Sequence, residues 1–114
     1  MSNNNKLKEY QEFTRTTAIY PKEKALEYLA LGLCSESGEV AAAQKRRIRD
    51  TNLGSEADEK LKQQILAELG DCLWYISEIA SELDTDLEQV LDSNIAKLKD
   101  RKARDVLKGS GDNR

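Results

Sequence analysis

The sequence has 114 residues, enough for a single domain over residues 1–114, and a formal net charge of −3. This balance argues against a nucleic-acid partner held by bulk charge, and no apolar run reaches the roughly 18 residues that a membrane-spanning helix needs. Histidine is absent, which excludes imidazole bases and His-bound zinc.

One proline and six glycines leave few helix breakers, so the chain is predicted to be all-α. Ser55 is placed to cap a third helix, and Thr85 with Glu88 forms a capping box that opens a fourth. The predicted helices run over about residues 4–18, from Pro21 or Lys22 to about Arg47, over 56–83, and from Thr85 to near Arg104. Four helices with short connections favour an antiparallel four-helix bundle. Residues from about 105 to 114 are predicted to form a flexible or lid-like tail.

The second predicted helix is apolar almost all round over residues 25–34. A monomer of this size would leave Tyr28 or Leu31 of this helix exposed to water. We therefore expect the helix to be buried against another chain, and the protein to be an oligomer.

The two cysteines, Cys34 and Cys72, lie in apolar stretches without the spacing of metal ligands. The first five residues are polar and lack an apolar signal segment. These features predict reduced core thiols and a cytoplasmic location.

Two pairs of carboxylates, each spaced i and i+3, lie against the predicted core faces. Glu36 falls on the apolar stripe of the second helix, with Glu39 at its edge. Glu68 and Asp71 border the stripe of the third helix, beside Tyr75. Such acids are most often solvated surface groups, but four of them facing one core would raise one another's pKa unless a cation were bound. Oxygen ligands without His or Cys favour a hard ion, Mg²⁺ or Mn²⁺.

The fourth predicted helix carries a basic pair beside a polar residue. Asn94 lies in the middle of its apolar stripe, and Lys97 and Arg101 flank the same side. By themselves these bases would most simply pair with neighbouring acids such as Asp100 and Asp105. Beside a carboxylate metal cluster, a phosphate-bearing ligand fits them better.

The order of these motifs resembles a known family. Glu36-Ser-Gly-Glu39, followed after 28 residues by Glu68-Leu-Gly-Asp71, is similar to the E-x-x-E…E-x-x-D motif of the MazG-like, all-α nucleoside triphosphate pyrophosphohydrolases. The apolar segment 25–33 and the Asn94, Lys97 and Arg101 pattern support this resemblance. The Gly-Ser-Gly-Asp-Asn-Arg tail looks like that of small, stand-alone bacterial and phage members. The similarity extends from about Tyr10 to Arg114.

The resemblance implies a set of roles for these residues. The four carboxylates would be Mg²⁺ ligands, with Mn²⁺ as a substitute. Lys97 and Arg101 would contact the triphosphate, with Asn94 beside them. The reaction would cleave the bond between the α- and β-phosphates of a nucleoside triphosphate and release pyrophosphate. Members act in nucleotide-pool housecleaning, often on deoxynucleotides, and form dimers or tetramers. The segment between the two carboxylate pairs is at the long end of the family's range.

A mechanism follows as a hypothesis. Either Glu36 or Glu39 would hold the attacking water rather than the metal, and the sequence leaves this choice open. Tyr75 is a candidate contact for the sugar or base, whereas Trp74 is predicted to pack at a subunit contact.

Two alternative functions remain open. One is a non-catalytic helical interaction module, whose acids and bases form surface ion pairs. The other is a member of the superfamily with a narrower substrate, namely a dUTP or phosphoribosyl-ATP pyrophosphohydrolase.

Overall fold

The computed structural model describes residues 5–114, and the secondary structure of this part of the chain is entirely helical. Its elements are α1 (Lys6–Arg15), the 3₁₀ helix η2 (Lys22–Lys24), α2 (Ala25–Asp50), α3 (Glu56–Glu82) and α4 (Leu87–Ala103). The prediction of an all-α chain is confirmed. Asn4, where the first helix was predicted to begin, lies outside the described residues. None of the helices described combines the length and the apolar character that a membrane crossing requires.

Side-chain caps define two of the helix starts. Ser55 caps α3 as predicted, because its hydroxyl accepts a hydrogen bond from the backbone N–H of Asp58 at 3.1 Å. The predicted Thr85 capping box is wrong by one residue, since Asp86 caps α4 by accepting from the N–H of Gln89 at 2.8 Å. Asp86 has the extended backbone of an N-cap and a carboxylate, which is among the best caps.

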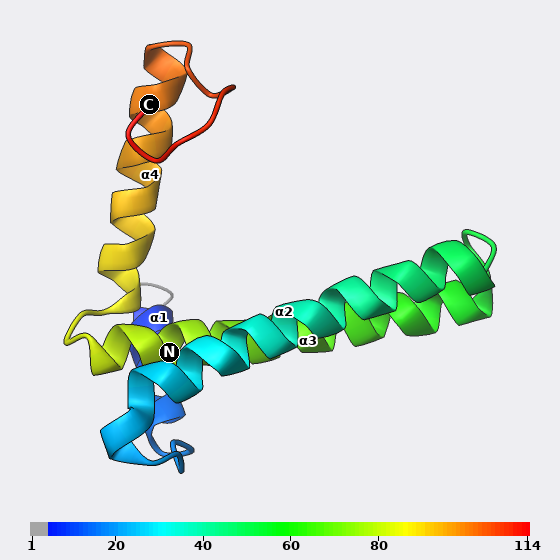
Figure 1. Ribbon diagram of the computed structural model, residues 1–114, viewed down its shortest axis with the longest axis horizontal. Coiled ribbons are helices and arrows are strands. Elements are labelled where there is room, and N and C mark those ends of the chain that lie inside the picture. Colours follow the sequence, from blue (N-terminus) through cyan, green and yellow to red (C-terminus); the bar gives the residue numbers. More distant parts are fainter. Residues whose placement is uncertain (1–4) are drawn as a thin grey trace.

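Helices α2 and α3 run side by side as a long antiparallel hairpin (Figure 1). A buried ion pair holds its turn: the fully buried carboxylate of Asp58 accepts from Arg47 Nε at 2.7 Å and from the N–H of Gly54 at 3.2 Å. Gly54 has a φ of +84°, a left-handed conformation that glycine adopts without strain. The hydrogen bond from Arg47 lowers the pKa of Asp58, so this carboxylate stays charged.

A buried polar network joins α1 to the last turns of α3. Glu78 is fully buried, and its two oxygens accept hydrogen bonds from Thr14 at 2.7 Å, from Arg15 at 2.9 Å and from Tyr20 at 2.8 Å. Tyr20 also belongs to the apolar core, together with Ala25 and Leu29. This network fixes α1 across the end of α3 from which α4 departs.

Helix α4 extends away from the hairpin at the end where α1 lies (Figure 1). Its direction is set by Gln11, whose amide nitrogen donates to Ser81 Oγ and to the carbonyl of Thr85, both at 2.9 Å. The amide oxygen of Gln11 accepts from the N–H of Leu87 at 3.0 Å. Helices α2 and α4, both described in full, do not touch. The predicted antiparallel four-helix bundle is therefore not closed within this one chain.

Candidate metal centre

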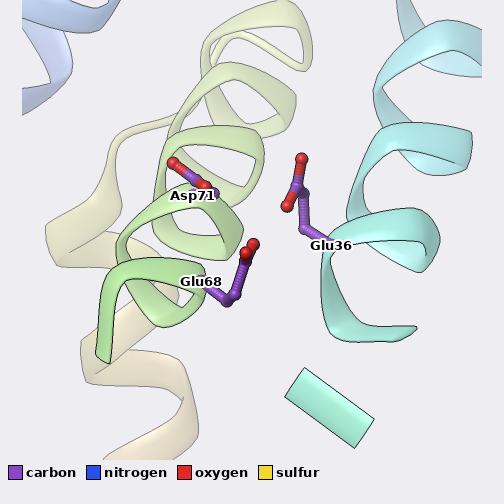
Figure 2. A group of neighbouring side chains, drawn as sticks. All are labelled: Glu36, Glu68 and Asp71. Atoms are coloured by element: carbon purple, nitrogen blue, oxygen red, sulfur yellow. The ribbon is translucent and has the colours of Figure 1, made fainter. Parts of the chain in front are cut away.

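Three of the four predicted carboxylates converge between α2 and α3. Figure 2 shows Glu36 on α2 reaching toward Glu68 and Asp71 on α3. One oxygen from each of these side chains lies within 4.8 Å of the other two. Glu36 and Glu68 are half-buried and Asp71 is exposed. The i, i+3 spacing places Glu68 and Asp71 on one face of α3, and the hairpin brings Glu36 to the same level.

Glu39, the fourth carboxylate of the motif, lies nearly one turn beyond Glu36 and is exposed. It does not belong to the cluster of three converging oxygens. Its charge still contributes to the raised pKa of Glu68, so its carboxylate lies within electrostatic reach of the cluster. The structure thus places three carboxylates at one point and leaves the fourth outside that cluster, within electrostatic reach of Glu68.

The crowding of like charges changes the acidity of Glu68. A hydrogen bond with Glu36, burial, and the negative charges of Glu36, Asp71 and Glu39 raise the pKa of Glu68 to about 7. A divalent cation among these carboxylates would offset the repulsion. Oxygens that bind Mg²⁺ at about 2.1 Å stand roughly 3 to 4 Å apart, so small side-chain rotations would bring the cluster to that spacing. The donor set therefore fits Mg²⁺ or Mn²⁺.

An open hollow of about 360 Å³ adjoins the cluster and is lined by Glu36, Asp71, Trp74 and Tyr75. The two aromatic rings meet edge to face, with their centroids 5.0 Å apart. Tyr75 lies beside Asp71, on the side where the sequence places it, and its contact with a substrate stays a prediction. Trp74 is predicted to pack at a subunit contact, and this stays a prediction. It lines the hollow, and its indole N–H donates to Thr17 Oγ1 at 2.8 Å.

Two further residues near the site were missed by sequence reasoning. Gly32 faces the ring of Tyr75 so closely that an added Cβ would overlap with it. A glycine in the interior of an apolar helix was the available signal, because such a residue weakens the helix unless close packing requires it. Burial and the negative charge of Asp71 raise the pKa of Tyr10, which places this α1 side chain within electrostatic reach of the cluster.

The predicted phosphate-binding residues Asn94, Lys97 and Arg101 lie on α4, apart from the carboxylates of the same chain (Figure 1). Lys97 Nζ lies 2.8 Å from a carboxylate oxygen of Asp112, and Arg101 Nη2 lies 2.6 Å from the carbonyl oxygen of Asp112. Their partner is therefore not Asp100, which pairs with Arg104 instead. A surface groove of about 490 Å³ runs along this side of α4 and is lined by Thr85, Gln89, Val90, Ser93, Asn94 and Lys97.

Comparison with known proteins connects this arrangement to a family. Residues 24–105, which include all of α2, α3 and α4, match the MazG nucleotide pyrophosphohydrolase domain. The gene 37 protein of Mycobacterium phage L5 is 39% identical over an alignment of 111 residues, and the match covers 92% of this chain and 96% of the phage protein. No solved structure matches the chain. The extent of the domain match shows that the chain belongs to the MazG nucleotide pyrophosphohydrolase family.

Proposed function

We propose that this protein is a Mg²⁺-dependent enzyme that hydrolyses nucleoside triphosphates to the monophosphate and pyrophosphate. The observation that carries the proposal is the convergence of Glu36, Glu68 and Asp71 within 4.8 Å in a chain of this family. Deoxynucleotides as preferred substrates, and a role in removing unwanted nucleotides from the pool, are the finer part of the proposal. They rest on family membership.

The roles of the carboxylates follow from their positions. Glu36, Glu68 and Asp71 would hold Mg²⁺, with Mn²⁺ as a substitute, because among residues 5–114 these three carboxylates offer oxygens at one point. The chemistry that Mg²⁺ supplies in such a site is neutralisation of phosphate charge and activation of water. Glu39 lies outside the cluster but within electrostatic reach of Glu68, and is the candidate for holding the attacking water. Under this proposal Glu36 binds the metal and Glu39 holds the water, which is one of the two choices that the sequence leaves open.

The reaction needs one proton transfer and one bond exchange. The Glu39 carboxylate takes a proton from water while the water oxygen bonds to phosphorus in line with the leaving group. The bridging P–O bond between the α- and β-phosphates breaks, and pyrophosphate leaves with the electron pair. The hollow beside Trp74 and Tyr75 would accept the sugar or base of the substrate. Its volume is in the range of small-molecule sites.

An oligomer would complete this site. Many large apolar side chains on the hairpin are exposed in the single chain, among them Leu31 (73% exposed), Leu66, Leu69 and Leu73. Soluble monomers rarely expose that much apolar surface in one region. We infer that two hairpins pair into an antiparallel four-helix bundle, as a homodimer or within a homotetramer. We also infer that α4 of one copy brings Asn94, Lys97 and Arg101 to the carboxylates of another.

The proposed cellular location and partners of the enzyme follow from its substrate and from its cysteine thiols. Cys34 and Cys72 are both free, as expected for reduced thiols. Cys34 is nevertheless exposed in the single chain, which corrects the prediction that it is a core residue. We propose a cytoplasmic enzyme with nucleotides as its ligands, and with neither nucleic acid nor membrane as a partner.

Pyrophosphate release from the four ribonucleoside and four deoxynucleoside triphosphates, measured with Mg²⁺ and with EDTA, tests the proposal. We expect Mg²⁺-dependent pyrophosphate and monophosphate, and at least a hundredfold loss in Glu68→Gln, a scale typical of catalytic groups. Glu27→Gln, an exposed acid on α2, is the control and should keep full activity. Activity confined to dUTP would favour the narrower-substrate alternative. If every nucleotide is left intact and Mg²⁺ does not change the melting temperature, the protein is a non-catalytic interaction module and the proposed enzymatic function is wrong.

A further inference from the structure

Residues 105–114 are folded back onto α4 rather than extended from it (Figure 1). The side chain of Arg114 donates hydrogen bonds to the carbonyls of Val106, Leu107 and Gly111, at 3.2, 3.1 and 2.6 Å. Arg104 on α4 donates to the carbonyl of Arg114 at 2.8 Å. These bonds make the segment an ordered loop with a defined tip.

The glycines allow the loop to turn. Gly109 and Gly111 have φ angles of +102° and +89°, which other residues rarely adopt. Asp112 follows the second of these turns and lies against the basic face of α4. Its position is therefore specified by backbone conformation and by the bonds of Arg114.

Asp112 contacts the two cations that the family resemblance assigns to the triphosphate. One carboxylate oxygen lies 2.8 Å from Lys97 Nζ and 3.3 Å from Arg101 Nη2, and the Asp112 carbonyl accepts a second bond from Nη2 at 2.6 Å. These cations lower the pKa of Asp112, so its carboxylate stays charged at neutral pH. Without it, two like charges spaced i and i+4 would repel each other and separate.

The contacts leave donors available for a ligand. The side chain of Arg101 is 8% exposed and its Nε is buried, but among residues 5–114 only its Nη2 donates hydrogen bonds, so Nη1 remains free to donate to a ligand. Within the same described part of the chain, Lys97 makes one hydrogen bond and lines the groove that contains Asn94. Asp112 is itself 76% exposed, so water screens its charge from an incoming anion.

We propose that Asp112 is a positioning residue that holds Lys97 and Arg101 side by side as one binding site for a polyphosphate chain. The inference rests on the proposed function, which assigns phosphate binding to these two side chains. Asp112 accepts hydrogen bonds from one side of each cation and so fixes the orientation of that side chain. The donors that do not bond to Asp112 remain for phosphate oxygens. In this proposal the 105–114 loop holds the side chains of the phosphate site in place, in contrast to the flexible or lid-like tail that the sequence predicts.

Binding of tripolyphosphate, measured by calorimetry in parallel with nucleotide kinetics, tests the proposal. Asp112→Asn should weaken tripolyphosphate binding and raise the nucleotide KM, each by about tenfold, as expected for loss of one charge-assisted contact. It should leave kcat within about twofold. Asp112→Glu, which keeps the carboxylate, should recover much of the affinity. Asp105→Asn is a matched control, because it removes the same charge from the same segment and Asn tolerates its φ of +57°.

The two measurements separate this inference from the proposed function. If nucleotides are hydrolysed but Asp112→Asn binds tripolyphosphate as the wild type does, the positioning role of Asp112 is wrong and the proposed enzymatic function is supported. If Asp112→Asn binds tripolyphosphate more tightly, Asp112 competes with phosphate, and positioning is overturned. If hydrolysis is absent but tripolyphosphate binding depends on Asp112, the positioning role is supported and the proposed enzymatic function is wrong. Wild-type protein that does not bind tripolyphosphate overturns the inference.

Discussion

Glu68 is the side chain whose protonation links the candidate metal centre to stability. Its pKa is raised to about 7 in the folded chain, above the ordinary value of 4.5 that applies after unfolding. Between these values the folded state binds more protons, so the free energy of unfolding falls as the pH rises. We expect metal-free protein in EDTA to melt at a higher temperature at about pH 5.5 than at about pH 7.5.

Glu68→Gln and added Mg²⁺ provide the controls for this pH dependence. The Gln side chain does not titrate, so the variant should lose the slope in this pH window. Mg²⁺ competes with the proton, and should therefore raise the melting temperature more at the higher pH. Asp58 and Glu82 have lowered pKa values, so the stability they contribute is lost only at more acidic pH. A wild-type slope that persists in Glu68→Gln would contradict the assignment.

The packing of α1 on α3 depends on one buried carboxylate. Glu78 is fully buried and accepts from Thr14, Arg15 and Tyr20, so removing it takes one acceptor from each of these buried or partly buried donors. Arg15 and Tyr20 keep Glu82 as their second acceptor. We expect Glu78→Ala to lower the free energy of unfolding by about 3 kcal/mol, as for other broken buried ion pairs. Urea denaturation measures this change. Glu12→Ala, an exposed position on α1, should shift it by less than about 0.5 kcal/mol; equal losses in both variants would refute the role of Glu78.

Local sequence signals predicted most of the helices and missed what depends on distant contacts. Breakers, caps and apolar spacing placed α3 to within one residue, including the Ser55 cap. Helix α2 begins at Ala25, after a 3₁₀ turn, and ends at Asp50, three residues beyond the predicted end. Helix α1 ends at Arg15, three residues before the predicted end. There the hydroxyls of Thr16 and Thr17 bond the carbonyls of Phe13 and Thr14 at 2.7 and 2.8 Å, an alternative to helical bonding that residue type alone does not reveal.

In the candidate site, too, the sequence predicts the local arrangement and misses what depends on distant contacts. The i, i+3 pattern was enough to bring Glu68 and Asp71 to one face, and antiparallel helices brought Glu36 to them. The direction of α4 was beyond such reasoning, because the bonds of Gln11 to Ser81 and Thr85 span 70 and 74 positions in the sequence. The separation of Lys97 from the carboxylates of its own chain follows from that one junction.

In the whole chain, the distance between Lys97 and the carboxylates raises the question of whether two copies share one active site. Within one copy, α4 extends from one end of the hairpin and does not touch α2 (Figure 1). The exposed apolar surface of the hairpin provides a contact for a second copy. If the proposed function is right, each active site combines carboxylates from one chain with Lys97 and Arg101 from another.

Mixing two inactive variants distinguishes a shared site from a site within one chain. Glu68→Gln removes a metal ligand, and Arg101→Met removes a phosphate contact, so each should be inactive by itself. In a mixed dimer with shared sites, one site carries both substitutions and the other carries neither. Random pairing makes half of the dimers mixed, so mixing equal amounts should restore about a quarter of wild-type activity.

The same mixture gives a different result if α4 serves the carboxylates of its own chain. Every site then carries exactly one of the two substitutions, and no activity returns. Mixing must follow unfolding and refolding so that subunits exchange, and light scattering checks that the mixture has the same mass as the wild type. Recovered pyrophosphate release would show that catalysis requires two copies, because neither parent contains a complete set of side chains. Lack of recovery in a properly exchanged mixture would require α4 to move onto its own hairpin.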